Sequence, residues 1–134
     1  MKFLSDEWIK KAKQITAEKL DPEKDLKKAT TSLLNIIENI PPNGSSIYFF
    51  ISVKNGFIEE FIINKTGSVL NKDAEFVVIG NYDTFVQILK GEMSITIALI
   101  KNRINIKGDK VKALKFVKPM DKFNTCLRQI KTEY

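Results

Sequence analysis

The first apolar positions of the chain repeat at helical spacing. Ser5 is a good N-cap, and Trp8, Ala12 and Ile15 then fall on one face of a helix. We expect this helix to end near Lys19.

A second helical pattern begins directly afterwards. Asp21 is suited to cap it, and Pro22 would occupy the first helical position. The turn sequence Pro41-Pro42-Asn43-Gly44 would stop it. The apolar stripe between these signals is Leu26, Ala29, Leu33, Ile36, Ile37 and Ile40. The sequence therefore predicts two helices before any sheet.

The next apolar runs are typical of strands. Ile47–Val53 is strongly β-forming, Asn55-Gly56 is a strong hairpin signal, and Phe57–Ile63 returns as the second strand. After a turn expected at Thr66-Gly67-Ser68, Glu75–Ile79 predicts a third strand.

Residues 81–100 predict a capped helix followed by an unusually apolar segment. Asn81 is a plausible N-cap and Gly91 can end the helix, with an apolar face between them. Ser94–Ile100 is too apolar for one face of a surface helix and too rich in β-branched residues to favour one. We expect this segment to be covered, by protein or by ligand.

The last third alternates between strand and helix signals. Arg103–Lys107 alternates polar and apolar residues, as a half-buried strand does, and Gly108-Asp109 breaks it. A helical pattern with Val111, Leu114 and Val117 follows. Pro119 is expected to open a C-terminal helix. Its apolar stripe would be Phe123, Leu127 and Ile130.

The stretch from Asn81 to Phe116 resembles the sterol carrier protein type-2 lipid-binding domains. The positions that match are the N-cap Asn81, the helix-ending Gly91, the pair Ala98-Leu99, the strand end Ile104-x-Ile106-x-Gly108-Asp109, and Ala113-Leu114-Lys115. The positions that depart from the family are Ser94-Ile95 in place of Asp-Pro, Asn102 in place of Gly, and Lys112 in place of an apolar residue. These departures concern the ligand and the turn more than the fold.

The resemblance implies an α/β domain of the α+β type. Its mostly antiparallel five-stranded sheet would be covered on one side by helices and would enclose an apolar tunnel. The ligand would be a fatty acid, acyl-CoA, sterol or isoprenoid-like lipid. The tunnel floor would come from inward residues of the hairpin strands. Its wall would include Phe85, Leu89, Met93, Ile97, Ile100, Ile104, Ile106 and Leu114, with Phe123 and Leu127 on a helical lid. Filling a core would explain each of these residues equally well.

Length and composition agree with one globular domain over residues 1–134. With 43% apolar and 28% charged residues the chain is not of the disordered class. The N-terminal segment has no signal-peptide pattern, and no run approaches the roughly 20 apolar residues of a membrane helix. Cys126 is the only cysteine, which excludes an internal disulfide and fits a reducing compartment. We therefore expect a cytoplasmic protein with Cys126 buried.

The positive charge is concentrated at the C-terminal end. Residues 101–134 contain ten Lys or Arg and three Asp or Glu, whereas residues 1–100 contain twelve and thirteen. A solvated face explains this bias, and attraction to anionic lipid headgroups or to the phosphates of an acyl carrier is the alternative. The residues expected to contact a membrane or an anion are Lys112, Lys115, Lys118 and Lys122.

The inventory of reactive residues argues against an enzyme. The chain has no His, and a single Cys cannot build a thiolate zinc site. Glu59 and Glu60 are adjacent, so in a strand they point to opposite faces. Gly91 and Gly108 are isolated and form no phosphate loop. We expect no catalytic residue, no metal and no cofactor.

Two alternatives to lipid binding stay open. A pI near 9.4 fits nucleic-acid binding, but Arg103 and Arg128 are the only arginines, and Tyr48, Phe49 and Phe50 lie in a run more typical of core. A protein-interaction module that dimerises through a sheet edge would leave no mark in the sequence. The sequence favours non-catalytic binding and transfer of an apolar lipid, and it leaves the oligomeric state open.

Overall fold

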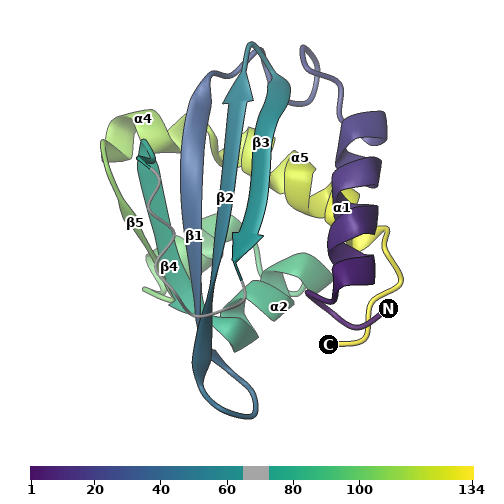
Figure 1. The fold of residues 1–134 in the computed structure, drawn as a ribbon. Helices are drawn as coiled ribbons and strands as arrows, with labels where there is room; N and C mark the ends of the chain where they lie inside the picture. The colour runs from purple at the N-terminus through teal and green to yellow at the C-terminus, as the bar shows by residue number, and fades with distance from the viewer. Residues whose placement is uncertain (65–72) are drawn as a thin grey trace.

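A five-stranded sheet with helices on one face forms the fold (Figure 1). The computed structural model of the chain describes residues 1–64 and 73–134, so the expected turn at Thr66-Gly67-Ser68 lies outside the described residues. The elements are α1 (Asp6–Lys19), β1 (Thr31–Ile40), β2 (Ser45–Lys54), β3 (Phe57–Asn64), β4 (Phe76–Asn81), α2 (Tyr82–Lys90), α3 (Ile95–Ile100), β5 (Ile104–Lys107), α4 (Lys110–Leu114) and α5 (Val117–Arg128).

The sheet confirms the expected fold class. Its strand order is β3-β2-β1-β4-β5, and every neighbouring pair is antiparallel except β1 and β4, which are parallel. Helices α2 and α5 lie behind the sheet in Figure 1, and α1 stands beside β3. The result is an α+β fold in which one face of the sheet meets the helices.

Helix α1 has the predicted bounds, and the N-terminal segment that carries it contacts the C-terminal end of the chain. The Ser5 hydroxyl accepts a hydrogen bond from the backbone N–H of Trp8 (3.2 Å). The Trp8 indole N–H donates to the Thr132 hydroxyl (3.0 Å). Lys2 and Glu133 form a parallel β-bridge, and the termini lie side by side (Figure 1).

The second predicted helix is wrong, because its C-terminal part is the central strand β1. Asp21 does act as a start signal, since its side chain accepts from the backbone N–H groups of Glu23 and Lys24 (2.9 and 2.8 Å). Only turns follow, and Lys27 and Lys28 leave the helical region with φ values of 55° and 53°. β1 has apolar residues on both faces, Leu33 and Ile37 toward the pocket and Leu34 on the other side, so its spacings resembled those of a helix.

The predicted hairpin is confirmed as β2 and β3. Asn55 and Gly56 both have positive φ values (51° and 83°), as a tight two-residue hairpin turn requires. The Gly56 backbone N–H also donates to the carbonyl of Ala29 (2.8 Å), which ties the hairpin turn to the segment before β1. The strand predicted at Glu75–Ile79 is confirmed as β4.

Helix α2 is confirmed, but the following apolar segment is not covered as expected. Gly91 ends α2 with φ 81°, the left-handed conformation predicted for it. Ser94–Ile100 forms the short helix α3, with the Ser94 hydroxyl accepting from the backbone N–H of Ile97 (3.1 Å). Ile95 and Ala98 form the buried inner face of α3, whereas Ile97 and Ile100 on its outer side are exposed to solvent.

The C-terminal elements match the predicted types with shifted bounds. β5 alternates as expected, with Ile104 and Ile106 buried. Asp109 caps α4 by accepting from the backbone N–H of Lys112 (3.1 Å). Helix α5 begins two residues before Pro119 and ends at Arg128, so Ile130 packs in the core beyond the helix.

Candidate functional site

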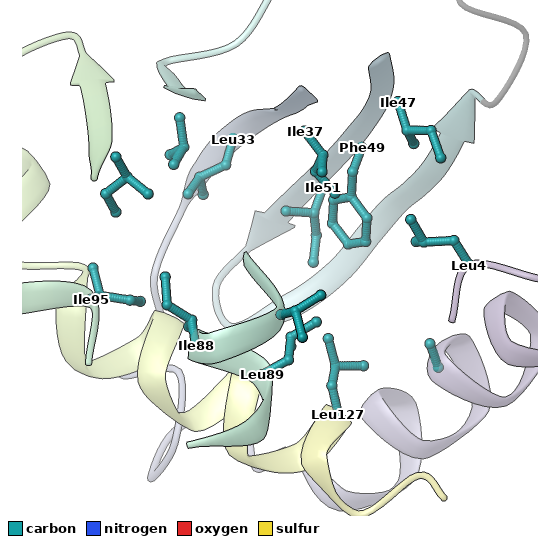
Figure 2. Close-up of a cluster of buried hydrophobic side chains, with 14 of the residues drawn as sticks. Leu4, Leu33, Ile37, Ile47, Phe49, Ile51, Ile88, Leu89, Ile95 and Leu127 are labelled. Carbon is teal, nitrogen blue, oxygen red and sulfur yellow. The ribbon is translucent and has the colours of Figure 1, made fainter. Parts of the chain in front are cut away.

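An apolar pocket lies between the helix-bearing face of the sheet and the helices. Its volume is about 130 Å³. Figure 2 shows Leu33, Ile37 and Ile51 on the strands pointing toward Leu89 and Leu127 on the helices. The pocket therefore occupies the layer where the main core would otherwise be close-packed.

The strands supply the floor of the pocket. Four strands contribute their inward-facing residues, and the central strand β1 contributes the longest run. Along β1 the lining extends from Thr31 to Ile37, which is roughly 20 Å at about 3.3 Å per residue. The lining residues on strands are Thr31, Leu33, Asn35, Ile37, Phe49, Ile51, Val53, Val78, Ile104 and Ile106.

Helix α5 supplies the roof and reaches the sheet through two aromatic side chains. Phe116, just before α5, packs edge-on against Phe76 with ring centroids 5.7 Å apart. Phe123, further along α5, contacts Phe49 and Phe61 at centroid distances of 6.3 and 6.0 Å. The residues between and beside these contacts line the pocket: Pro119, Met120, Asn124 and Leu127.

An arginine connects the roof to helix α2. The Arg128 guanidinium donates from Nε to the carbonyl of Leu89 (3.0 Å) and from Nη2 to the carbonyl of Ile88 (3.1 Å). Both carbonyls lie in the last turn of α2, beyond the reach of the helix's own N–H groups, and the carbonyl of Ile88 also accepts from the backbone N–H of Gly91 (3.1 Å). Because Ile88 and Leu89 also line the pocket, this contact fixes the roof against one wall.

Six of the ten predicted ligand-binding residues line the pocket. They come from α2, β5 and α5, which the fold brings to the same layer. They are Phe85, Leu89, Ile104, Ile106, Phe123 and Leu127. Their role in binding a ligand stays a prediction.

The other four predicted residues lie outside the pocket. Met93 is half-buried and packs at the edge of the core. Ile97, Ile100 and Leu114 are 41%, 70% and 66% exposed. They do not form a wall of the pocket, because α3 and α4 are short surface helices whose inner faces are filled by Ile95, Ala98 and Ala113.

The predicted anion-contacting lysines are all exposed, but they are not equivalent. Lys115, Lys118 and Lys122 extend from α4 and α5 and form no ion pair within residues 1–64 and 73–134. Lys112 instead donates from Nζ to the Glu75 carboxylate (2.6 Å). This bond, with a second from the Thr31 hydroxyl, lowers the pKa of Glu75.

Sequence reasoning missed several lining residues on β1 and α5. Leu33, Asn35 and Ile37 alternate on one face of β1, a period-two signal hidden by the helical interpretation. Met120 and Asn124 could have been found from their i+4 and i+8 spacing from Phe116, which places them on one face of α5.

The described residues offer no metal site and no helix that could cross a membrane. Within residues 1–64 and 73–134 no three His, Cys, Asp or Glu side chains are grouped to hold an ion. Over the same residues, no helix has the length and apolar character of a membrane span. Cys126 is buried, its thiol donates to the carbonyl of Ile15 (3.4 Å), and burial raises its pKa.

Known structures share this architecture. A conserved hypothetical protein from Thermus thermophilus superposes with a TM-score of 0.77 at 15% identity, covering 99% of this chain and 92% of its own. A crystal structure of sterol carrier protein 2 also gives 0.77 at 15% identity, with coverages of 96% and 99%. The solution structure of palmitated SCP2L2 from Aedes aegypti gives 0.59 at 17% identity, with coverages of 85% and 92%. At these identities the likenesses establish the fold.

Sequence comparison extends this from fold to family. No curated protein matches the chain significantly. The sequence profile described as the SCP-2 sterol transfer family matches residues 12–121, most of the chain. The chain therefore belongs to the SCP-2 sterol transfer family.

Proposed function

We propose that this protein binds the apolar part of a lipid in the pocket between α5 and the sheet and transfers it without catalysis. The apolar lining of that pocket is the observation that carries the proposal. Membership in a sterol transfer family points the same way, and one structural neighbour is a palmitated protein. We also propose that the protein is cytoplasmic, because its single cysteine, Cys126, is buried and unpaired.

The size of the pocket limits what binds without rearrangement. Its volume of about 130 Å³ is close to that of an engineered cavity in another protein, roughly 150 Å³, that binds benzene. A whole sterol or long acyl chain is much larger than benzene, so it requires a wider pocket. Widening is easiest at the roof, since α5 packs on other helices and reaches the strands mainly through Phe116 and Phe123.

In this proposal, burial of the lipid's hydrocarbon chain supplies the binding energy. Each methylene removed from water contributes about 0.8 kcal/mol, so ten methylenes contribute roughly 8 kcal/mol before the cost of association. The displacement of α5 opposes this gain. The net gain is therefore below roughly 8 kcal/mol, so we expect a Kd above about 1 μM for chains of about ten carbons.

The surface of α4 and the start of α5 is suited to touch an anionic bilayer. Val111 on α4 is 72% exposed and lies on the same short helix as the exposed Leu114. Exposed lysines at positions 115, 118 and 122 follow these aliphatic side chains in sequence. Each lysine close to an anionic surface contributes about 1 kcal/mol, within a Debye length of about 8 Å. We propose that this basic surface guides the protein to membranes during transfer.

A blocking substitution tests the pocket. Met120→Trp adds volume at a half-buried pocket position and should abolish binding of a fluorescent fatty acid, with little change in urea unfolding if the side chain borders a void. In a close-packed core the same change would cost roughly 1–3 kcal/mol. Gln129→Trp, at the exposed end of α5, is the control. Lost stability with unchanged binding would refute the pocket, and mass spectrometry of co-purified lipid would identify the natural ligand.

A charge-reversal variant tests the membrane surface. Changing Lys115, Lys118 and Lys122 to Glu should slow lipid transfer to anionic vesicles and leave binding of soluble lipid within a few-fold. The control changes Lys10, Lys24 and Lys54 to Glu, which alters net charge equally on other elements. If the rate of lipid transfer does not depend on vesicle charge, and the protein binds nucleic acid tightly at physiological salt, the nucleic-acid alternative is favoured.

A further inference from the structure

Asn35 is a polar residue in an apolar part of the sheet. It lies on the pocket-facing side of the central strand β1, opposite Phe49 of β2 and Val78 of β4. Those two residues are buried, and so are Leu33 and Ile37, its neighbours on the same face of β1. Asn35 itself is only half-buried. Because the surrounding side chains are closed off, its free surface opens onto the pocket.

Within the part of the chain that the structure describes, the Asn35 side chain uses only part of its hydrogen-bonding capacity. Its Nδ2 donates to the carbonyl of Phe49 at 3.5 Å, longer than the usual 2.7–3.2 Å. A side-chain amide has two N–H donors and a carbonyl oxygen that accepts two bonds. A polar group in apolar surroundings is destabilising unless it finds a partner. The remaining donor and acceptor sites are therefore available to a group in the pocket.

The other polar lining residues do not duplicate this position. The Thr31 hydroxyl donates to the Glu75 carboxylate (2.6 Å) at the start of β1. Asn124 lies on α5, the element that must move to admit a long ligand. Asn35 is fixed in the middle of the sheet by strands on both sides, so its amide is held in place when the roof moves.

The charge of the lining restricts the partner. Within residues 1–64 and 73–134, none of the lining residues is Lys, Arg, Asp or Glu. An ionised carboxylate buried without a counter-charge is strongly unfavourable. A hydroxyl is neutral, and it both donates and accepts, which matches the two functions of the amide.

We propose, building on the proposed function, that Asn35 recognises the hydroxyl of an uncharged lipid alcohol in the pocket and sets a preference for alcohols over carboxylates. The amide oxygen accepts the hydroxyl proton, and Nδ2 donates to the hydroxyl oxygen. An ionised fatty acid of equal length lacks the donor and retains its charge, so it binds more weakly.

Three ligands with ten-carbon chains test this without any substitution. Decanol both donates and accepts, decyl methyl ether only accepts, and decanoate is charged at neutral pH. Calorimetric titration of the wild-type protein should rank decanol first, about tenfold tighter than decanoate and several-fold tighter than the ether. Equal affinities for decanol and decanoate would overturn the inference and leave lipid binding intact. Failure of all three to bind would overturn the proposed function itself.

Substitutions test which residue sets the preference for decanol. Asn35→Leu should weaken decanol binding about five- to tenfold and ether binding by less, because the ether loses only the bond from Nδ2; the difference between the two ligands should disappear. Asn35→Thr keeps a hydroxyl and suits a strand, so it should retain part of the preference if the leucine variant folds poorly. Asn43→Leu, in the exposed β1–β2 turn, is the control. If Asn124→Leu removes the preference and Asn35→Leu does not, the recognition group is on α5 and the inference is wrong.

Discussion

The contact of Arg128 with the end of α2 should be a measurable part of the stability of the roof. Arg128→Met removes both hydrogen bonds to the carbonyls of Ile88 and Leu89 and keeps an apolar side chain of similar length. Each bond should contribute about 1 kcal/mol at this partly buried position. Loss of a cation near the C-terminus of α2 adds about 0.3–1 kcal/mol. We therefore expect a loss of about 2–3 kcal/mol.

The other arginine of the chain provides the control. Arg103 is exposed in the turn before β5, so Arg103→Met should change stability by less than about 0.5 kcal/mol. For 134 residues the unfolding entropy is roughly 0.28 kcal/mol per kelvin, so 2 kcal/mol corresponds to about 7 °C in Tm. Urea unfolding and thermal melts followed by circular dichroism measure both values. Equal midpoints for the two variants would refute the role assigned to Arg128.

Three further predictions concern other contacts. Glu75 has a lowered pKa because Lys112 and Thr31 donate to it, so its pair with Lys112 contributes stability above the ordinary Glu pKa and loses it as pH falls further. The difference between wild type and Lys112→Met should therefore be below about 1 kcal/mol at pH 7 and shrink as the pH falls below the ordinary Glu pKa; a constant difference would contradict this. A Cβ at Gly56 would collide with the carbonyl oxygen of Pro22, whereas one at Gly44 meets nothing within 4 Å. In urea unfolding, Gly44→Ala should lower the free energy of unfolding by roughly 1–2 kcal/mol, and Gly56→Ala should lower it by more. Equal losses would show that the segment before β1 shifts to make room for the added methyl group. The buried Cys126 thiol, with its raised pKa, should react with a thiol reagent only after unfolding, and fast reaction in the native protein would place it at the surface.

Local signals predicted those elements whose ends are set by particular residues. Ser5 fixed the start of α1, Asn55-Gly56 fixed the hairpin, and Gly91 fixed the end of α2. Each acts through its own backbone geometry or a bond to a near neighbour. Such signals require no knowledge of the tertiary structure.

The central strand β1 could not be recognised in the same way. Its residues are apolar on both faces, so it lacks the alternation of a half-buried strand, and its pairing with β2 and β4 cannot be read from the sequence pattern of β1 alone. The helical interpretation of β1 hid Asn35 and the part of the pocket floor that β1 supplies. The exposure of Ile97, Ile100 and Leu114 was also beyond the sequence, since apolar composition does not show which face of a short helix meets the core.

The location of the ligand is the central claim, and methyl-resolved NMR tests it most directly. Titration of isotopically labelled protein with decanol should shift the methyl signals of Leu33, Ile51 and Ile106, which line the pocket on three different strands. The methyl signals of Ile97, Ile100 and Val111 should not move, since these side chains are exposed on α3 and α4. Shifts confined to the exposed group, with the pocket methyls unchanged, would show that lipid binds on the surface and would contradict a pocket between α5 and the sheet.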